Sequence, residues 1–280
     1  MELRVGCALW AHEPWQGKYL PARLSRRAEL AAYASWCNAV ESTATFFRSP
    51  APSKIAGWAE QVPAGFRFAF KLPHAITHEH RLRESGAEAR AFLATLAPLG
   101  DRAEPVSIQL PNTFGPPQVD DLARLLGSLP TSHRYAVEIR NPLFFAGDST
   151  ERTLERVLTD HGVEWASFDT ATLFAAPPAS EAEREAWGKK PRVPARTTAL
   201  TDRPVVRYVG CDDVARTEAG WQPWLDIVVG WLEEGRVPTV FVHTPDNDDA
   251  LLLARRFHDQ VRARLPQLDP LPEPERPTPT

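Results

Sequence analysis

Short apolar segments that end in a charged or polar residue recur along the chain, with amphipathic stretches between them. In segment 135–140, large apolar residues alternate with Ala136, Glu138 and Arg140. Successive side chains of a β-strand point to opposite faces, so these three residues share one face. A strand with one large apolar face and one small face that turns polar at its carboxyl end is typical of a parallel barrel.

The same kind of segment is found seven more times. The predicted strands cover residues 3–7, 38–41, 66–71, 106–111, 135–140, 164–169, 205–210 and 238–243. Helical patterns lie between most of them, including 87–99, 116–129, 221–232 and 248–265. This alternation predicts an α/β fold, a TIM-like (β/α)8 barrel of parallel strands, as a single domain over residues 1–265. A doubly wound open sheet is the alternative, but no GxGxxG follows the first strand. The proline-rich residues 266–280 predict a frayed tail.

The carboxyl ends of parallel strands meet at one end of a barrel, where active sites lie. Most predicted strands end in a polar residue that shares a face with a small one, and burying charge without a use is costly. Alternation would place Asp169 with Ser167 on the inner face. We therefore expect one charged pocket that contains Glu41, Lys71, Gln109, Glu138, Arg140, Asp169, Arg207 and His243.

Each residue type suggests a role in this pocket. The acids Glu41, Glu138 and Asp169 are the candidate catalytic residues, and they could also hold a divalent ion. Candidate substrate-binding residues are cations that could grip a carboxylate or phosphate, and polar residues around them: Lys71, His78, Gln109, Arg140, Arg207 and His243. A structural ion pair between Glu138 and Arg140 is the alternative.

Aromatic residues are frequent in the loops that follow the strands. Trp10 and Trp15 are predicted to stack on a substrate. For the others, such as Phe46 and Phe47, a hydrophobic cover between loops is the preferred interpretation. The spacing of histidines over 74–80 is weak evidence for a metal.

Composition narrows the choice of partners. Acidic residues number 36 and basic residues 32. The net charge of −4 does not favour binding to duplex nucleic acid or to an acidic membrane, although a local basic groove is still an alternative. Three widely spaced cysteines predict neither a disulfide framework nor a zinc ribbon. The first residues predict a strand rather than a leader, and no segment is long enough to span a bilayer, so a cytoplasmic location is expected. The sequence carries no signal for an oligomeric state.

Motifs spread over most of the chain resemble the YecE-like family, also called domain of unknown function 72. The matching segments are Gly6–Trp10, Trp15-x-Gly17-x-Tyr19-x-Pro21, Tyr33-Ala34, Val40-Glu41, Thr45-Phe46, Phe68–Lys71, Thr77-His78, Gln109–Pro111 with Phe114, Val137–Arg140, Asp169, and Val206-Arg207 with Gly210. The resemblance implies a TIM-like barrel, and departures at residues 7–9, 43, 47 and 243–247 indicate a divergent branch. The family's activity is not established.

Three functional hypotheses follow. The first is an enzyme, of hydrolase or lyase type, that acts by acid–base chemistry on a small anionic substrate, either phosphorylated, carboxylate or sugar-like. The second is a protein that binds or processes nucleic acid, with or without a metal, as barrel similarity to apurinic endonucleases has suggested for relatives. The third is a non-catalytic ligand-binding barrel. No nucleotide-cofactor motif is present, and a divalent metal is the one cofactor left open.

Overall fold

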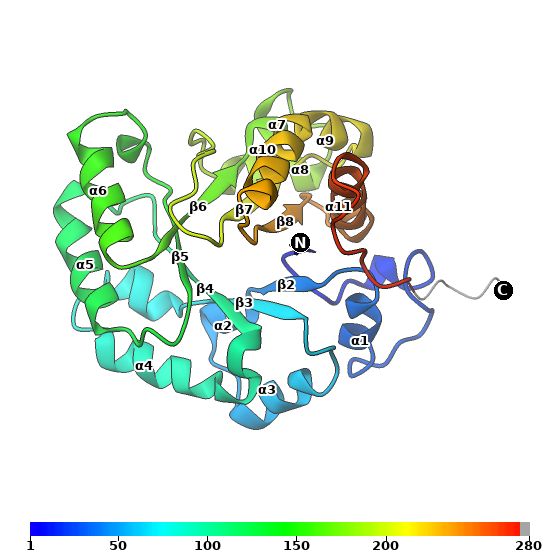
Figure 1. Ribbon diagram of the computed structural model, residues 1–280, viewed down its shortest axis with the longest axis horizontal. Helices are drawn as coiled ribbons and strands as arrows, with labels where there is room; N and C mark the ends of the chain where they lie inside the picture. Colours follow the sequence, from blue (N-terminus) through cyan, green and yellow to red (C-terminus); the bar gives the residue numbers. More distant parts are fainter. Residues whose placement is uncertain (275–280) are drawn as a thin grey trace.

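Eight parallel strands form one curved sheet around which the helices are arranged (Figure 1). The computed structural model describes residues 1–274. Each strand pairs with the next along the chain from β2 to β8, and β8 pairs with β1. The TIM-like barrel is confirmed. Its strands are β1 (Arg4–Gly6), β2 (Ala39–Ser42), β3 (Arg67–Lys71), β4 (Ala103–Gln109), β5 (Tyr135–Glu138), β6 (Glu164–Asp169), β7 (Val205–Val209) and β8 (Thr239–His243).

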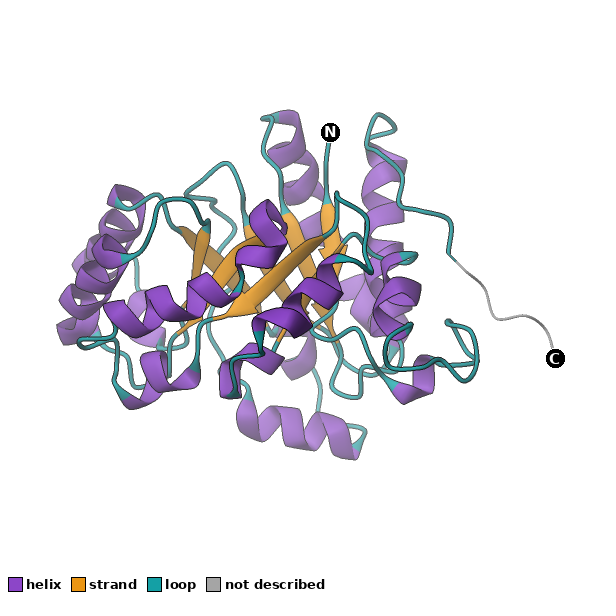
Figure 2. Ribbon diagram, turned by 90° about the horizontal axis from the view of Figure 1, so that it is seen from below, coloured by secondary structure: helices purple, strands orange, loops and turns teal. Residues whose placement is uncertain are grey.

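The helices cover the outer face of the strands, as Figure 2 shows. The first α-helix after β1 begins at Glu29. The Asp148 side chain accepts from Thr150 N and Glu151 N and so caps the helix that begins at Ser149. The helices are α1 (Glu29–Ala34), α2 (Ala44–Phe47), α3 (Pro52–Ala59), α4 (Gly86–Thr95), α5 (Val119–Ser128), α6 (Ser149–Asp160), α7 (Ala171–Phe174), α8 (Glu181–Lys189), α9 (Val214–Gly220), α10 (Gln222–Glu233) and α11 (Ala250–Arg264).

Most residues that face the inside of the barrel are small. A separate buried cluster contains one inward residue from each of six strands: Ala39, Ala69, Ala136, Ala166, Val205 and Phe241. Four of the six are alanines, so long polar side chains two residues further along the same strands have room to point inward. On β6 the inward residues are Ala166 and then Phe168, which puts Ser167 and Asp169 on the outer face.

Side chains help to close the seam between β1 and β2. Only one backbone hydrogen bond between these strands is found within residues 1–274, from Glu41 N to Cys7 O at 2.9 Å. The buried Tyr33 hydroxyl accepts from Cys7 N and donates to Ala39 O, each at 2.8 Å. A Cβ at Gly6 would lie 1.9 Å from Ala39 O, so glycine is required where the strands approach. The closed seam places Glu41 among the other strand ends.

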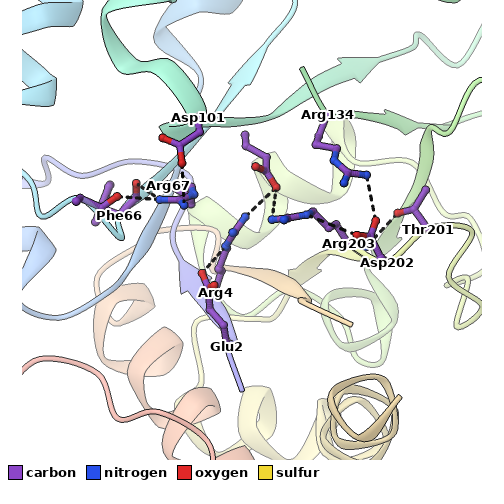
Figure 3. A network of polar contacts seen from close by, with 11 residues as sticks. Glu2, Arg4, Phe66, Arg67, Asp101, Arg134, Thr201, Asp202 and Arg203 are labelled. Carbon is purple, nitrogen blue, oxygen red and sulfur yellow. Dashed lines mark hydrogen bonds and ion pairs between the residues drawn. The ribbon is translucent and has the colours of Figure 1, made fainter. Parts of the chain in front are cut away.

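The amino-terminal end of the barrel is filled by paired charges (Figure 3). The buried Arg4 donates to Glu104 Oε1 at 3.0 Å, and Arg203 donates to the same oxygen at 2.7 Å. Arg134 and Asp202 form a further, exposed pair. A hollow of about 10 Å³ lies among these residues, against about 450 Å³ at the opposite end of the barrel, which is therefore the end with open space.

The end of the chain packs against α11 as far as the structure describes it. Leu268 and Leu271 are buried, and Arg255 Nη1 donates to Pro272 O at 2.7 Å. The prediction of a frayed tail from residue 266 is therefore wrong over 266–274, because leucines between the prolines reach the core; residues 275–280 lie outside the described part. Over 1–274, no helix combines the length and the hydropathy needed to cross a membrane.

Candidate functional site

A hollow of about 450 Å³ opens where the strands end. We call it the anion pocket, after the ligand that we propose for it below. Its wall includes five of the predicted site residues, and these come from β3, β4, β7, β8 and the residues after β5: Lys71, Gln109, Arg140, Arg207 and His243. Phe46 and Phe47 of α2 form one side. Another side is formed by α8 and the residue after it: Ala182, Glu185, Ala186, Lys189 and Lys190. The structure thus brings these five predicted residues together at the expected end of the barrel.

The two predicted glutamates do not line the anion pocket themselves, but both pair with cations that do. Glu41 and Glu138 are buried and Arg207 lies between them. Arg207 Nε is 2.7 Å from Glu41 Oε1, Nη2 donates to Glu41 Oε2 at 2.8 Å, and Nη1 donates to Glu138 Oε2 at 2.6 Å. Arg140 Nε donates to Glu138 Oε1 at 2.6 Å, and Lys71 Nζ is 3.6 Å from Glu41 Oε2. The Glu138–Arg140 pair considered from the sequence is therefore part of a larger ion network.

The charges in this network keep both glutamates ionised. Burial by itself raises the pKa of the Glu138 carboxyl, but Arg140, Arg207 and Lys71 together hold that pKa well below its ordinary value. The pKa of Glu41 is also lowered, since Arg207 and Lys71 outweigh its burial and its repulsion by Glu138. In this arrangement the carboxylates hold the cations in place, and neither carries a proton to donate at neutral pH.

Two lysines in the anion pocket have lowered pKa values. Burial and the nearby Arg207 lower the pKa of Lys71 to about 8, and its Nζ donates to Gln109 Oε1 at 2.9 Å. Burial, Arg207 and Arg140 lower the pKa of Lys190 to about 8 as well. For Lys190 Nζ, no hydrogen bond or ion pair is found among residues 1–274. Sequence reasoning missed Lys190, because it follows a helix in the segment 170–203 and no strand pattern leads to it.

The two predicted histidines are neutral. Burial, with the charges of Lys190, Arg207 and Lys71, lowers the pKa of His243 well below its ordinary value. Burial, His74 and Arg140 lower the pKa of His78 to about 4. His78 lies beside the anion pocket, where its Nδ1 is 2.8 Å from Thr77 Oγ1. Both histidines can therefore act as hydrogen-bonding groups near neutral pH without carrying charge.

Asp169 lies on the other side of the barrel wall from the network. Its Oδ2 accepts from Trp224 Nε1 of α10 at 2.7 Å, and its Oδ1 accepts from Ala171 N at 2.8 Å. The prediction that Asp169 faces the pocket is wrong, because Ala166 and Phe168 are inward residues of β6 and the alternation then turns Asp169 outward. Phe168 takes the inward position, with its ring centre 5.2 Å from Arg140 Cζ and 5.4 Å from Arg207 Cζ.

The two tryptophans predicted to stack on a substrate lie elsewhere. Trp15 is completely buried, its ring stacks on Tyr33, and its Nε1 donates to Asn247 O at 2.9 Å. Trp10 packs edge-on against Trp58 at 5.1 Å and against Phe68. Both belong to the layer between strands and helices, and neither lines the anion pocket. Loop position alone did not distinguish buried aromatic residues from exposed ones.

No set of metal ligands accompanies the pocket. Over the described residues, there is no group of three or more His, Cys, Asp or Glu placed to hold a metal ion. The three cysteines are buried and form no disulfide bond with one another. Cationic side chains dominate the chemistry of the pocket.

The fold and the pocket define a TIM-like barrel protein with an ion network at the carboxyl ends of its strands. The chain belongs to the family described as protein of unknown function DUF72, whose model matches residues 4–278. It is 35% identical over 268 residues to the UPF0759 protein YecE of Escherichia coli strain K12, with 96% of each chain covered, and equally to that of Escherichia coli O157:H7.

Solved structures of the same family share the fold. A DUF72 family protein from Thermotoga maritima is 20% identical, with a TM-score of 0.72 over 94% of this chain and 100% of the other. One from Enterococcus faecalis is 18% identical, with a TM-score of 0.68 over 95% of this chain and 98% of the other. At this level of identity the likeness supports the barrel and not a shared substrate.

Proposed function

We propose that the chain is an enzyme that binds a small anionic substrate, a carboxylate or a phosphate ester, in the anion pocket. The balance of charge around the pocket carries the proposal. Lys71, Arg140, Lys190 and Arg207 supply four positive charges and the two buried glutamates supply two negative ones, which leaves 4 − 2 = 2 positive charges when both lysines are protonated. An anion that enters would compensate them.

Arg140 and Lys190 are the residues best suited to contact the anion. Arg140 is 17% exposed, and within residues 1–274 it makes hydrogen bonds only through Nε, so its two Nη groups are free to form a bidentate contact. Lys190 has no partner in the same range. Arg207, by contrast, is buried and directs its nitrogens at Glu41 and Glu138, so it would act as a positioning residue.

Lys71 is the group best placed to transfer a proton. With a pKa of about 8, roughly one molecule in ten carries a neutral Lys71 amine at pH 7. An amine close to its pKa can both accept and donate a proton. Acid–base chemistry would then depend on Lys71, while the glutamates predicted as catalytic residues would set the charge around it.

Calorimetric titration with inorganic phosphate and with pyruvate tests the proposal. Arg140→Gln and Lys190→Met should each raise the Kd about 10-fold to 100-fold, the range expected for a charge-assisted hydrogen bond. Lys189→Met is the matched control, because Lys189 also lines the pocket but is exposed and paired with Glu185. Equal binding by all four proteins, or the absence of binding to either anion, contradicts the proposal. Binding without turnover of any substrate would favour the non-catalytic barrel.

A further inference from the structure

An exposed aromatic ring stands at the edge of the anion pocket. Phe47, the last residue of α2, is 82% exposed, more than any other large hydrophobic residue in the described part of the chain. It lines the anion pocket and also a second hollow of about 430 Å³ beside it, and Phe46 does the same. The two hollows therefore meet at this pair of rings. The hydrophobic cover predicted for Phe47 from the sequence is not formed.

Phe47 is supported by other rings, which form an aromatic shelf of Phe46, Phe47, His74 and His78. The Phe47 and His74 rings are 6.1 Å apart at an interplanar angle of 24°, and the His74 and His78 rings are 4.4 Å apart at 18°. Phe46 meets each of the other three edge-on, at 5.0–5.3 Å. Three roughly parallel rings braced by a fourth hold Phe47 in one orientation while leaving it open to solvent.

The aromatic shelf adjoins the cations of the anion pocket. Lys71 Nζ lies 5.9 Å from the centre of the Phe46 ring, and the charges of Lys71 and Arg140 both contribute to the lowered pKa of His78. The second hollow offers hydrogen-bonding groups, since it is lined by Ser49 and by Glu88, whose Oε2 lies 3.2 Å from His80 Nδ1. A molecule with its anionic group in the pocket could therefore lay a flat ring on Phe47 and direct polar edges at these side chains.

We propose that the anion pocket and the aromatic shelf together bind a nucleotide, with its phosphate among the cations and its base stacked on Phe47. This deepens the proposed function and rests on it. A base continues the row of parallel rings, because every base has a flat π-face. A bare sugar phosphate would place only a puckered ring on the open face of Phe47 and would gain less from it.

Binding of inorganic phosphate, ribose 5-phosphate and adenosine 5′-monophosphate tests the inference by calorimetry. The wild-type protein should bind the nucleotide about 5-fold to 150-fold more tightly than ribose 5-phosphate, the range that one stacked base supplies. Phe47→Ala should reduce this ratio to near one and leave the Kd of inorganic phosphate unchanged, while Phe47→Trp should preserve the ratio. Because Phe47 is exposed, all variants are expected to fold, and their melting temperatures check this.

Leu143→Ala is the matched control, because Leu143 is 58% exposed but lines neither hollow. It should leave the ratio unchanged. A wild-type protein that binds the nucleotide no more tightly than ribose 5-phosphate overturns the inference, and so does a Phe47→Ala variant that keeps the preference. If inorganic phosphate or pyruvate still binds in either case, the proposed anion site stands; if neither anion binds, both proposals fail.

Discussion

Glu138→Gln tests whether the ion network holds the carboxyl end of the barrel together. The amide has almost the shape of the carboxylate but carries no charge. Arg140 then loses the carboxylate 2.6 Å from its Nε, and Arg207 keeps only Glu41. Removing one partner from a buried ion pair costs about 3–5 kcal/mol, because the remaining charge is left uncompensated.

The measurement is the free energy of unfolding in urea, supported by the melting temperature. For a chain of this size, a loss of about 3–5 kcal/mol corresponds to a decrease in melting temperature on the order of 10 °C. Glu185→Gln is the control, because the Glu185–Lys189 pair is exposed on α8 and screened by solvent, so its loss should leave stability almost unchanged. A Glu138→Gln protein within about 1 kcal/mol of the wild type would refute the reasoning that these cations depend on Glu138.

Three further predictions follow from the site. The pKa values of both buried glutamates are lowered, so their contribution to stability is present above the ordinary glutamate pKa of about 4.3 and is lost as the pH falls below it. Urea denaturation at pH 7, 4 and 3 checks this, and a stability that does not change with pH would contradict it. Pyruvate, whose charge is constant in this range, should bind more weakly as the pH rises through about 8, because Lys71 and Lys190 lose their protons; an affinity unchanged from pH 7 to pH 9.5 would argue against those lysines. Asp169→Ala should cost about 1–3 kcal/mol, by leaving the Trp224 N–H unpaired, yet keep the Kd for phosphate within about twofold; a 10-fold weaker Kd would place Asp169 at the site after all.

The alternation of short strands with helices was enough to predict the barrel, because most strand ends are marked by a change from apolar to polar residues. The same signal located Glu41, Lys71, Gln109 and Glu138, whose inward positions follow from the alanines or serine two residues earlier. It failed at β6. There Ala166 and Ser167 are both small, so the pattern does not say which of them faces inward, and the wrong choice moved Asp169 into the pocket.

Other features of the site depend on packing between distant segments. Lys190 reaches the pocket from the end of α8, and Phe47 is exposed because α2 presents it beside His74. Neither position has a periodic pattern that would set it apart in the sequence. Trp15 shows the converse, since a tryptophan in a loop after a strand is completely buried under Tyr33 and residue 247.

The most direct test of the anion pocket is a crystal structure of the protein, from crystals grown with inorganic phosphate. The expected result is one tetrahedral density within about 3 Å of an Arg140 Nη atom and of Lys190 Nζ, a normal hydrogen-bond distance. An empty pocket at a phosphate concentration that saturates binding in solution, or phosphate bound only at another surface, would contradict the claim that these strand ends form an anion site.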